Sequence, residues 1–188
     1  MKLNKLIAIA TISLLSGGIS MAQKALNLED IVAGNIIQTK GIGSMTWLKD
    51  GERYSRLENN KQTGGTDIVA YRAKDNSREV IIPSSLLTDK STGRPIPVRS
   101  VSWSADNEKV LIYNNTQRVW RYDTRGDYWV LNLKDGALRQ LGKGMPESSM
   151  MFAKFSPDGT RVAYVSNNNI YVEDIDSGKI TQLTKDGS

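Results

Sequence analysis

The chain has 188 residues, with 25 Lys and Arg against 20 Asp and Glu, and it contains no His and no Cys. Without His a Ser-His-Asp triad cannot be assembled, and zinc sites built on His or Cys are excluded too. A G-x-S-x-G nucleophile motif is also missing, so the sequence predicts no catalytic residue, no metal and no cofactor. The basic residues are scattered singly along the chain, which argues against a nucleic-acid surface.

Residues 1–22 have the pattern of a cleavable secretory signal. Lys2 and Lys5 precede a mostly apolar stretch from Leu6 to Leu15, and residues 20–22 form a small-x-small cleavage site. The apolar stretch is shorter than the ~20 residues that a membrane-spanning helix needs, so we expect cleavage and no membrane span afterwards. The mature chain is therefore expected in a bacterial periplasm or outside the cell.

Residues 23–43 form a lead-in with one short predicted helix, in the stretch N-L-E-D-I-V-A-G. Asn27 can cap this helix, Glu29 and Asp30 favour its positive end, and Gly34 can end it.

A hairpin motif then recurs three times. Trp47, Trp103 and Phe155 lie 56 and then 52 residues apart, and a polar four-residue turn and an alternating strand follow each of them. Every copy continues into a second hairpin, with good turn formers at Asp75-Asn76, Asp135-Gly136 and Ser177-Gly178. Four short strands repeated at this period are typical of a β-propeller blade.

We therefore predict an all-β chain, an incomplete β-propeller with about three four-stranded antiparallel blades near residues 44–85, 98–144 and 150–187. A closed ring needs roughly four to eight blades, so the chain is expected to be the N-terminal portion of a longer protein. A small β-sandwich of about twelve strands is the alternative. Residues 84–97 carry two prolines and are predicted to be an extended connector between the first two blades.

The second blade differs from the third in one connection. Its second and third strands are joined by residues 114–127, a stretch about ten residues longer than the S-N-N-N of the third blade. Loops on rigid scaffolds often carry binding groups, and a guanidinium can offer several N–H donors to a carbonyl or carboxylate. Arg121 is thus the candidate binding residue, with Trp120 beside it. In the structural alternative, Trp120 and Tyr122 are strand residues that cover the edge of the ring, and Arg125 pairs with Asp123 or Asp127.

The sequence resembles the propeller domain of dipeptidyl peptidase IV, a member of the prolyl oligopeptidase family of serine peptidases. Four segments in order carry the likeness: LNLEDIVAGNI, MTWLKDGERY, VWRYDTRGDYWVLNL and FSPDGTRVAYVSNNNIYVEDIDSGKITQLTKDG. In that family an eight-bladed propeller caps an α/β-hydrolase domain that carries a Ser-Asp-His triad. The enzyme releases X-Pro or X-Ala dipeptides from peptide N-termini.

The resemblance implies that Arg121 donates to a carbonyl of the substrate and that Trp120 supports it. The C-terminal α/β-hydrolase domain is absent from this chain, and so is the acidic motif that holds the substrate's amino group. Glu173 and Asp174 lie in a predicted strand of the third blade and are not that motif.

The chain is accordingly predicted to be the N-terminal, substrate-gating segment of a secreted serine-type dipeptidyl peptidase, without catalytic activity by itself. Its implied partners are peptides with Pro or Ala at the second position and the missing hydrolase domain. The resemblance also allows a homodimer of the full-length protein. The alternative is a non-enzymatic periplasmic propeller of the Tol-associated kind, which binds a protein partner.

Overall fold

The structure is a computed structural model that describes residues 27–32, 41 and 43–188. The chain divides into two units, Met1–Gly41 and Ile42–Ser188. In the first unit the predicted short helix is present as α2 (Leu28–Val32), and the Ile31 N–H donates to the Asn27 carbonyl at 3.3 Å. The predicted signal peptide and Gly34 lie outside the described residues.

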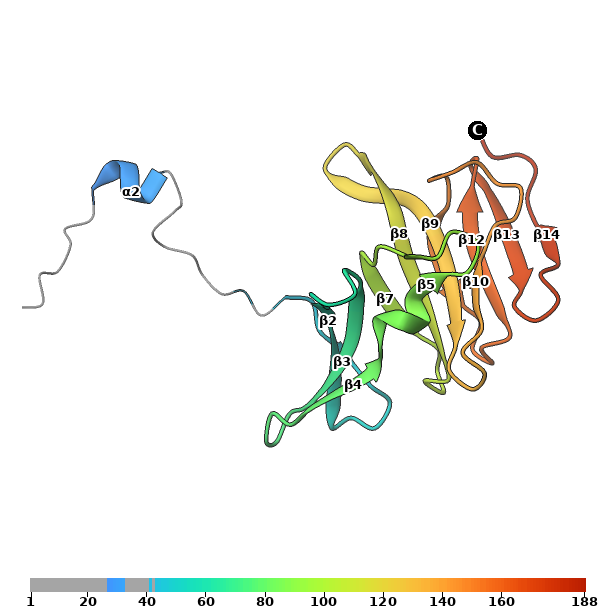
Figure 1. Cartoon of the computed structure of the whole chain (residues 1–188). Coiled ribbons are helices and arrows are strands. Elements are labelled where there is room, and N and C mark those ends of the chain that lie inside the picture. Colours follow the sequence, from blue (N-terminus) through green and yellow to red (C-terminus); the bar gives the residue numbers. More distant parts are fainter. Residues whose placement is uncertain (1–26, 33–40, 42) are drawn as a thin grey trace, which may run out of the picture. The chain divides into compact units, whose positions relative to one another are not determined.

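Within its described residues, the second unit contains three four-stranded antiparallel sheets that follow one another in chain order (Figure 1). We call them blades 1, 2 and 3. Blade 1 comprises β1 (Thr46–Trp47), β2 (Arg53–Asn59), β3 (Thr66–Arg72) and β4 (Arg78–Ile82). Blade 2 comprises β7 (Ser100–Trp103), β8 (Lys109–Val119), β9 (Tyr122–Asn132) and β10 (Leu138–Gln140). Blade 3 comprises β11 (Met151–Phe155), β12 (Arg161–Ser166), β13 (Asn169–Asp174) and β14 (Ile180–Gln182).

Blade 2 is covered by apolar side chains on both faces. Its Val110, Ile112 and Leu131 belong to a buried cluster with residues of blade 1 and of the connector, Ile68, Ile82, Leu87 and Ile96. Its Leu111 and Tyr128 belong to a second cluster with Ala153, Val162 and Tyr164 of blade 3. Successive residues of a strand point to opposite faces of the sheet, so Val110 and Ile112 of β8 pack in the first cluster and Leu111 packs in the second. The expected incomplete propeller with three four-stranded antiparallel blades is confirmed, and the two-layer sandwich was the wrong alternative.

The first turn of every blade has the same construction. Asp50, Asp106 and Asp158 each accept a hydrogen bond from the backbone N–H two residues later, at 2.9–3.0 Å. The next residue in each turn has a left-handed φ, 69° at Gly51, 60° at Asn107 and 67° at Gly159. Gly and Asn tolerate this conformation best, which is why the sequence predicted these turns correctly.

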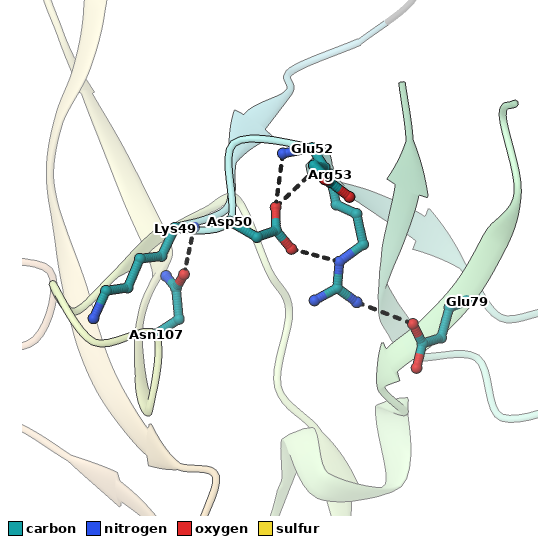
Figure 2. A network of polar contacts seen from close by, with 6 residues as sticks. All are labelled: Lys49, Asp50, Glu52, Arg53, Glu79 and Asn107. Atoms are coloured by element: carbon teal, nitrogen blue, oxygen red, sulfur yellow. Dashed lines mark hydrogen bonds and ion pairs between the residues drawn. The ribbon is translucent and has the colours of Figure 1, made fainter. Parts of the chain in front are cut away.

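Figure 2 shows the turn of blade 1 and its contact with blade 2. Asp50 accepts from the Arg53 Nε at 2.7 Å, and the same guanidinium reaches Glu79 at 3.1 Å. The Lys49 backbone N–H donates to Asn107 Oδ1 in blade 2 at 2.6 Å. The first turns of neighbouring blades therefore touch, and this contact helps to set one blade against the next.

We expect the protein to lose stability in acid when the aspartates of these turns become protonated. Hydrogen bonds from Arg53 hold the pKa of Asp50 at about 2, and those from Ser156 and Thr160 hold the pKa of Asp158 at about 2, both below the ordinary 3.8. Since the folded-state pKa is depressed, the stabilisation is present above pH 4 and is lost as the pH falls towards 2. Asp158→Asn should lower the melting temperature at pH 6, and this difference should shrink at pH 2.5.

Thermal unfolding at both pH values measures the effect of Asp158→Asn. Asp176→Asn is the matched control, because Asp176 is exposed and its carboxylate accepts no hydrogen bond in the described part of the chain. A difference between Asp158→Asn and the parent chain that is equally large at both pH values would contradict the assignment.

The connector between blades 1 and 2 is not extended, so that prediction was wrong. Residues Ser84–Leu87 form the 3₁₀ helix η1, and β5 (Thr88–Asp89) pairs with β6 (Arg94–Pro95) in a small hairpin. Leu87 and Ile96 are both buried, and the Ile96 N–H donates to the Leu87 carbonyl at 2.8 Å. Burial of two apolar side chains folds the segment back, which its two prolines did not reveal.

Candidate functional site

The segment predicted to be a loop, residues 114–127, is the outer half of a long β-hairpin. β8 and β9 have 11 residues each, and the turn between them consists of Trp120 and Arg121 alone. The loop prediction was wrong because cross-strand pairing continues to the turn, with register shifts around Gln117. Trp120 has a φ of 61°, which is rare for a bulky residue and costs about 1–3 kcal/mol. Such strained residues are common at ligand sites.

The two residues singled out from the sequence lie at the tip of this hairpin. The Trp120 side chain is 94% exposed and Arg121 is exposed as well. Within the described part of the chain, neither side chain has a hydrogen-bond, ion-pair or ring partner. The guanidinium of Arg121 is therefore available to a ligand. The binding roles of both residues remain predictions.

Arg121 also lines a hollow of about 590 Å³ in the second unit. The lining comes from three separate parts of the sequence, namely the lead-in to β1, the start of β7, and the β8–β9 hairpin. Every lining side chain carries an O–H or N–H group. The lining residues are Ser44, Arg99, Ser100, Tyr113, Arg118, Arg121 and Tyr122.

Tyr113 forms one wall of the hollow and is held in place. Its O–H donates to the Arg125 carbonyl at 2.8 Å, and its ring stacks on Tyr128 with centroids 4.8 Å apart. Gly126 lies against the same ring, and a Cβ added there would approach the Asn114 carbonyl oxygen to 2.6 Å. Only glycine fits this close approach, so the base of the hairpin is tightly packed against Tyr113.

The sequence offered Asp127 only as a possible partner of Arg125, and its role in anchoring this hairpin to the next blade was missed. Asp127 is 6% exposed and accepts from the Ser148 backbone N–H at 2.7 Å and from Asn115 Nδ2 at 2.6 Å. The Ser148 hydroxyl donates to the Asn115 carbonyl at 2.6 Å. The buried carboxylate therefore ties the hairpin to the link between blades 2 and 3.

The other two blades repeat this arrangement. Asp67 in blade 1 accepts from the Ser84 N–H at 2.7 Å and from Asn60 at 3.0 Å, and Asn169 in blade 3 accepts from the Gly187 N–H at 3.2 Å. Burial of Asp67 raises its pKa, but these hydrogen bonds outweigh burial and leave the pKa below its usual value. A sequence signal existed: each third strand has an Asp or Asn directly before its apolar run.

Glu173 is buried between blades 2 and 3, where it accepts hydrogen bonds from residues on both sides. It is 2% exposed and accepts from the Gly142 N–H at 2.8 Å and from the Tyr164 O–H at 3.2 Å, while Arg139 approaches at 3.5 Å. Burial and the nearby carboxylate raise the pKa of Tyr164, which therefore keeps the proton that it donates. These contacts occupy Glu173, and Asp174 accepts from Ser177 in the following turn.

The described residues offer neither a candidate metal site nor a helix that could span a membrane. They contain no group of three or more side chains suited to hold a metal ion. They also contain no helix that is long and apolar enough to cross a membrane.

Comparison with known proteins finds relatives that share this arrangement. Residues 104–188, which include the β8–β9 hairpin and blade 3, match the family model described as "Dipeptidyl peptidase IV (DPP IV) N-terminal region". The match covers a little under half of the chain. The resemblance noted in the sequence is thereby confirmed, and the chain is similar to the N-terminal propeller portion of a dipeptidyl peptidase IV-like peptidase.

Curated relatives of the chain are much longer than it is. Probable dipeptidyl-aminopeptidase B from Aspergillus terreus is 26% identical over 181 residues, which are 92% of this chain and 20% of that protein. Dipeptidyl-aminopeptidase B from Aspergillus niger is 26% identical over 177 residues, 90% of this chain and 19% of that protein. The chain thus spans about a fifth of the length of these dipeptidyl peptidase relatives.

A solved structure shows the same fold. The crystal structure of Porphyromonas gingivalis dipeptidyl peptidase 4 matches with a TM-score of 0.67 and 22% sequence identity, over 88% of this chain and 22% of that one. At this identity the match shows the fold alone.

Proposed function

We propose that this chain is the substrate-positioning propeller segment of a secreted serine-type dipeptidyl peptidase, which releases X-Pro or X-Ala dipeptides from peptide N-termini. The catalytic triad would lie on an α/β-hydrolase domain outside this chain, and the enzyme would act in the periplasm or outside the cell. The family match and the dipeptidyl peptidase relatives support the general class.

The observation that carries the proposal is the position of Arg121. It lies in a two-residue turn at the end of an 11-residue strand pair whose base is fixed by Asp127, and its guanidinium has no partner in the described part of the chain. A charged donor held in this way can bind the carbonyl of the first substrate residue. Correct placement of the substrate lowers the barrier even though the donor takes no part in the chemistry.

We expect Arg121→Ala in the full-length peptidase to lower kcat/KM for Gly-Pro-p-nitroanilide by about tenfold to a hundredfold, because a hydrogen bond to a charged group contributes roughly 1.5–3 kcal/mol. Arg121→Lys should recover part of the loss, since lysine keeps the charge but not the planar fork. The melting temperature should not change, because Arg121 is exposed. Steady-state kinetics and thermal unfolding measure both effects.

Arg94→Ala is the matched control, since Arg94 is an exposed arginine in the connector hairpin and should leave kcat/KM unchanged. An Arg121→Ala enzyme with parental kcat/KM would remove the assigned role. A full-length protein that cleaves no X-Pro or X-Ala substrate would overturn the proposed function, and the partner-binding propeller would then be preferred.

A further inference from the structure

The hollow beside Arg121 has an unusual lining. The side chains described at its lining are three arginines, two serines and two tyrosines, with no carboxylate among these seven. Arg99 has an interaction of its own, and the Tyr113 O–H already donates to a backbone carbonyl. Arg118 and Arg121 remain, both exposed, and neither has a carboxylate partner among the described side chains.

Arginines that line two other hollows of the second unit are neutralised within the chain. Arg53, in the hollow between blades 1 and 2, is paired with Asp50 at 2.7 Å and with Glu79 at 3.1 Å. Arg139, in a hollow on the border of blades 2 and 3, is 3.5 Å from Glu173. In the hollow beside Arg121, by contrast, Arg118 and Arg121 have no such ion pair among the described side chains.

This charge has a chemical consequence. Guanidinium groups that share one hollow repel each other, and they donate hydrogen bonds but cannot accept them. A ligand with a negative charge reduces the repulsion, and its acceptor oxygens receive the hydrogen bonds that the guanidinium groups donate. A carboxylate has two such oxygens, spaced to accept two parallel hydrogen bonds from one arginine. The lining thus favours a carboxylate over a neutral or cationic group.

We infer that Arg118 is a specificity-determining residue that binds the side-chain carboxylate of an acidic first residue in the peptide substrate. The inference rests on the proposed function, in which Arg121 binds the carbonyl of that same residue. The carbonyl and the side chain leave the same Cα, so a glutamate whose carbonyl meets Arg121 can extend its carboxylate into the hollow that Arg118 lines. Substrates that begin with Glu are then preferred to those that begin with Gln.

The test compares Glu-Pro-p-nitroanilide with Gln-Pro-p-nitroanilide, which have the same shape and differ in charge. At pH 7 and low salt, kcat/KM of the full-length peptidase should be about three- to tenfold higher for the Glu substrate than for the Gln substrate. This size is what an exposed but charge-assisted ion pair provides. Arg118→Gln should bring the ratio close to one, mainly by lowering kcat/KM for the Glu substrate. Arg118→Glu should reverse the preference, and 0.5 M NaCl should shrink it in the parent enzyme.

Arg94→Gln is the control for loss of a positive charge elsewhere and should keep the parental ratio. A parental ratio of one, or an Arg118→Gln ratio equal to the parental one, would overturn the inference while leaving the proposed function intact. Inhibition by succinate, measured at constant ionic strength, tests whether the hollow binds a free carboxylate instead of a substrate side chain. If succinate inhibits cleavage of Gln-Pro-p-nitroanilide by the parent enzyme but not by Arg118→Gln, while kcat/KM is equal for the Glu and Gln substrates, the hollow binds a free ligand and the inference fails. Absence of any X-Pro cleavage by the parent enzyme would remove the proposed function, and the inference with it.

Discussion

Replacing Glu173 with alanine is expected to lower the free energy of unfolding by about 3 kcal/mol, because removing a buried carboxylate leaves the groups that pair with it unsatisfied. Three donors would lose their acceptor: the Gly142 N–H, the Tyr164 O–H and the partly exposed Arg139 guanidinium. The first two are buried, so water cannot easily replace the lost hydrogen bonds. Urea unfolding followed by tryptophan fluorescence measures the change.

Two further variants make the Glu173 experiment specific. Glu173→Gln keeps an acceptor oxygen for Gly142 and should cost about half as much, since only the charge is lost. Glu147→Ala removes an exposed glutamate from the link between blades 2 and 3 and should change stability by less than about 0.5 kcal/mol. If Glu173→Ala unfolded at the same urea concentration as the parent, blades 2 and 3 would not depend on this carboxylate.

Asp127→Ala is expected to lower the free energy of unfolding by about 2–3 kcal/mol and to loosen the base of the β8–β9 hairpin. The change leaves the buried Ser148 N–H without its 2.7 Å partner and frees Asn115. Asp127→Asn should cost less, because blade 3 already uses an amide, that of Asn169, at the corresponding position. Hydrogen exchange at the Ser148 amide should be faster in Asp127→Ala, which reports the contact directly.

Asp135→Ala is the appropriate comparison for Asp127→Ala. Asp135 is an exposed aspartate of the same blade whose carboxylate accepts only within its own turn, and its loss should cost about 1 kcal/mol or less. Unchanged protection of the Ser148 amide in Asp127→Ala would show that the link to blade 3 is held by other contacts.

The site could be predicted only in part. Arg121 became a candidate because it lies, next to Trp120, in a connection about ten residues longer than its counterpart in the third blade, and its binding role stays a prediction. Arg118 and Ser100 could not be assigned to the same hollow, because their proximity depends on the register of β8 and on how β7 pairs with it. The anchoring role of Asp127 was overlooked because its partner is the Ser148 backbone N–H, which has no residue-type signature.

The sequence by itself determined the turns, the number of strands per blade and the repeat. A turn depends on a few consecutive residues: Asp158 accepts from the next residues and Gly159 supplies the left-handed φ, so the information is local. Alternation of apolar residues similarly sets which strand residues face a neighbour.

The tertiary structure alone decided the features that join distant residues. The long hairpin replaced a loop because cross-strand pairing persisted to Trp120, and the connector folded back because Leu87 and Ile96 found a buried surface between blades 1 and 2. The charged hollow exists because three separate segments meet at one place. Each of these depends on contacts between residues far apart in the chain, whose free energy is gained only once the blades have packed together.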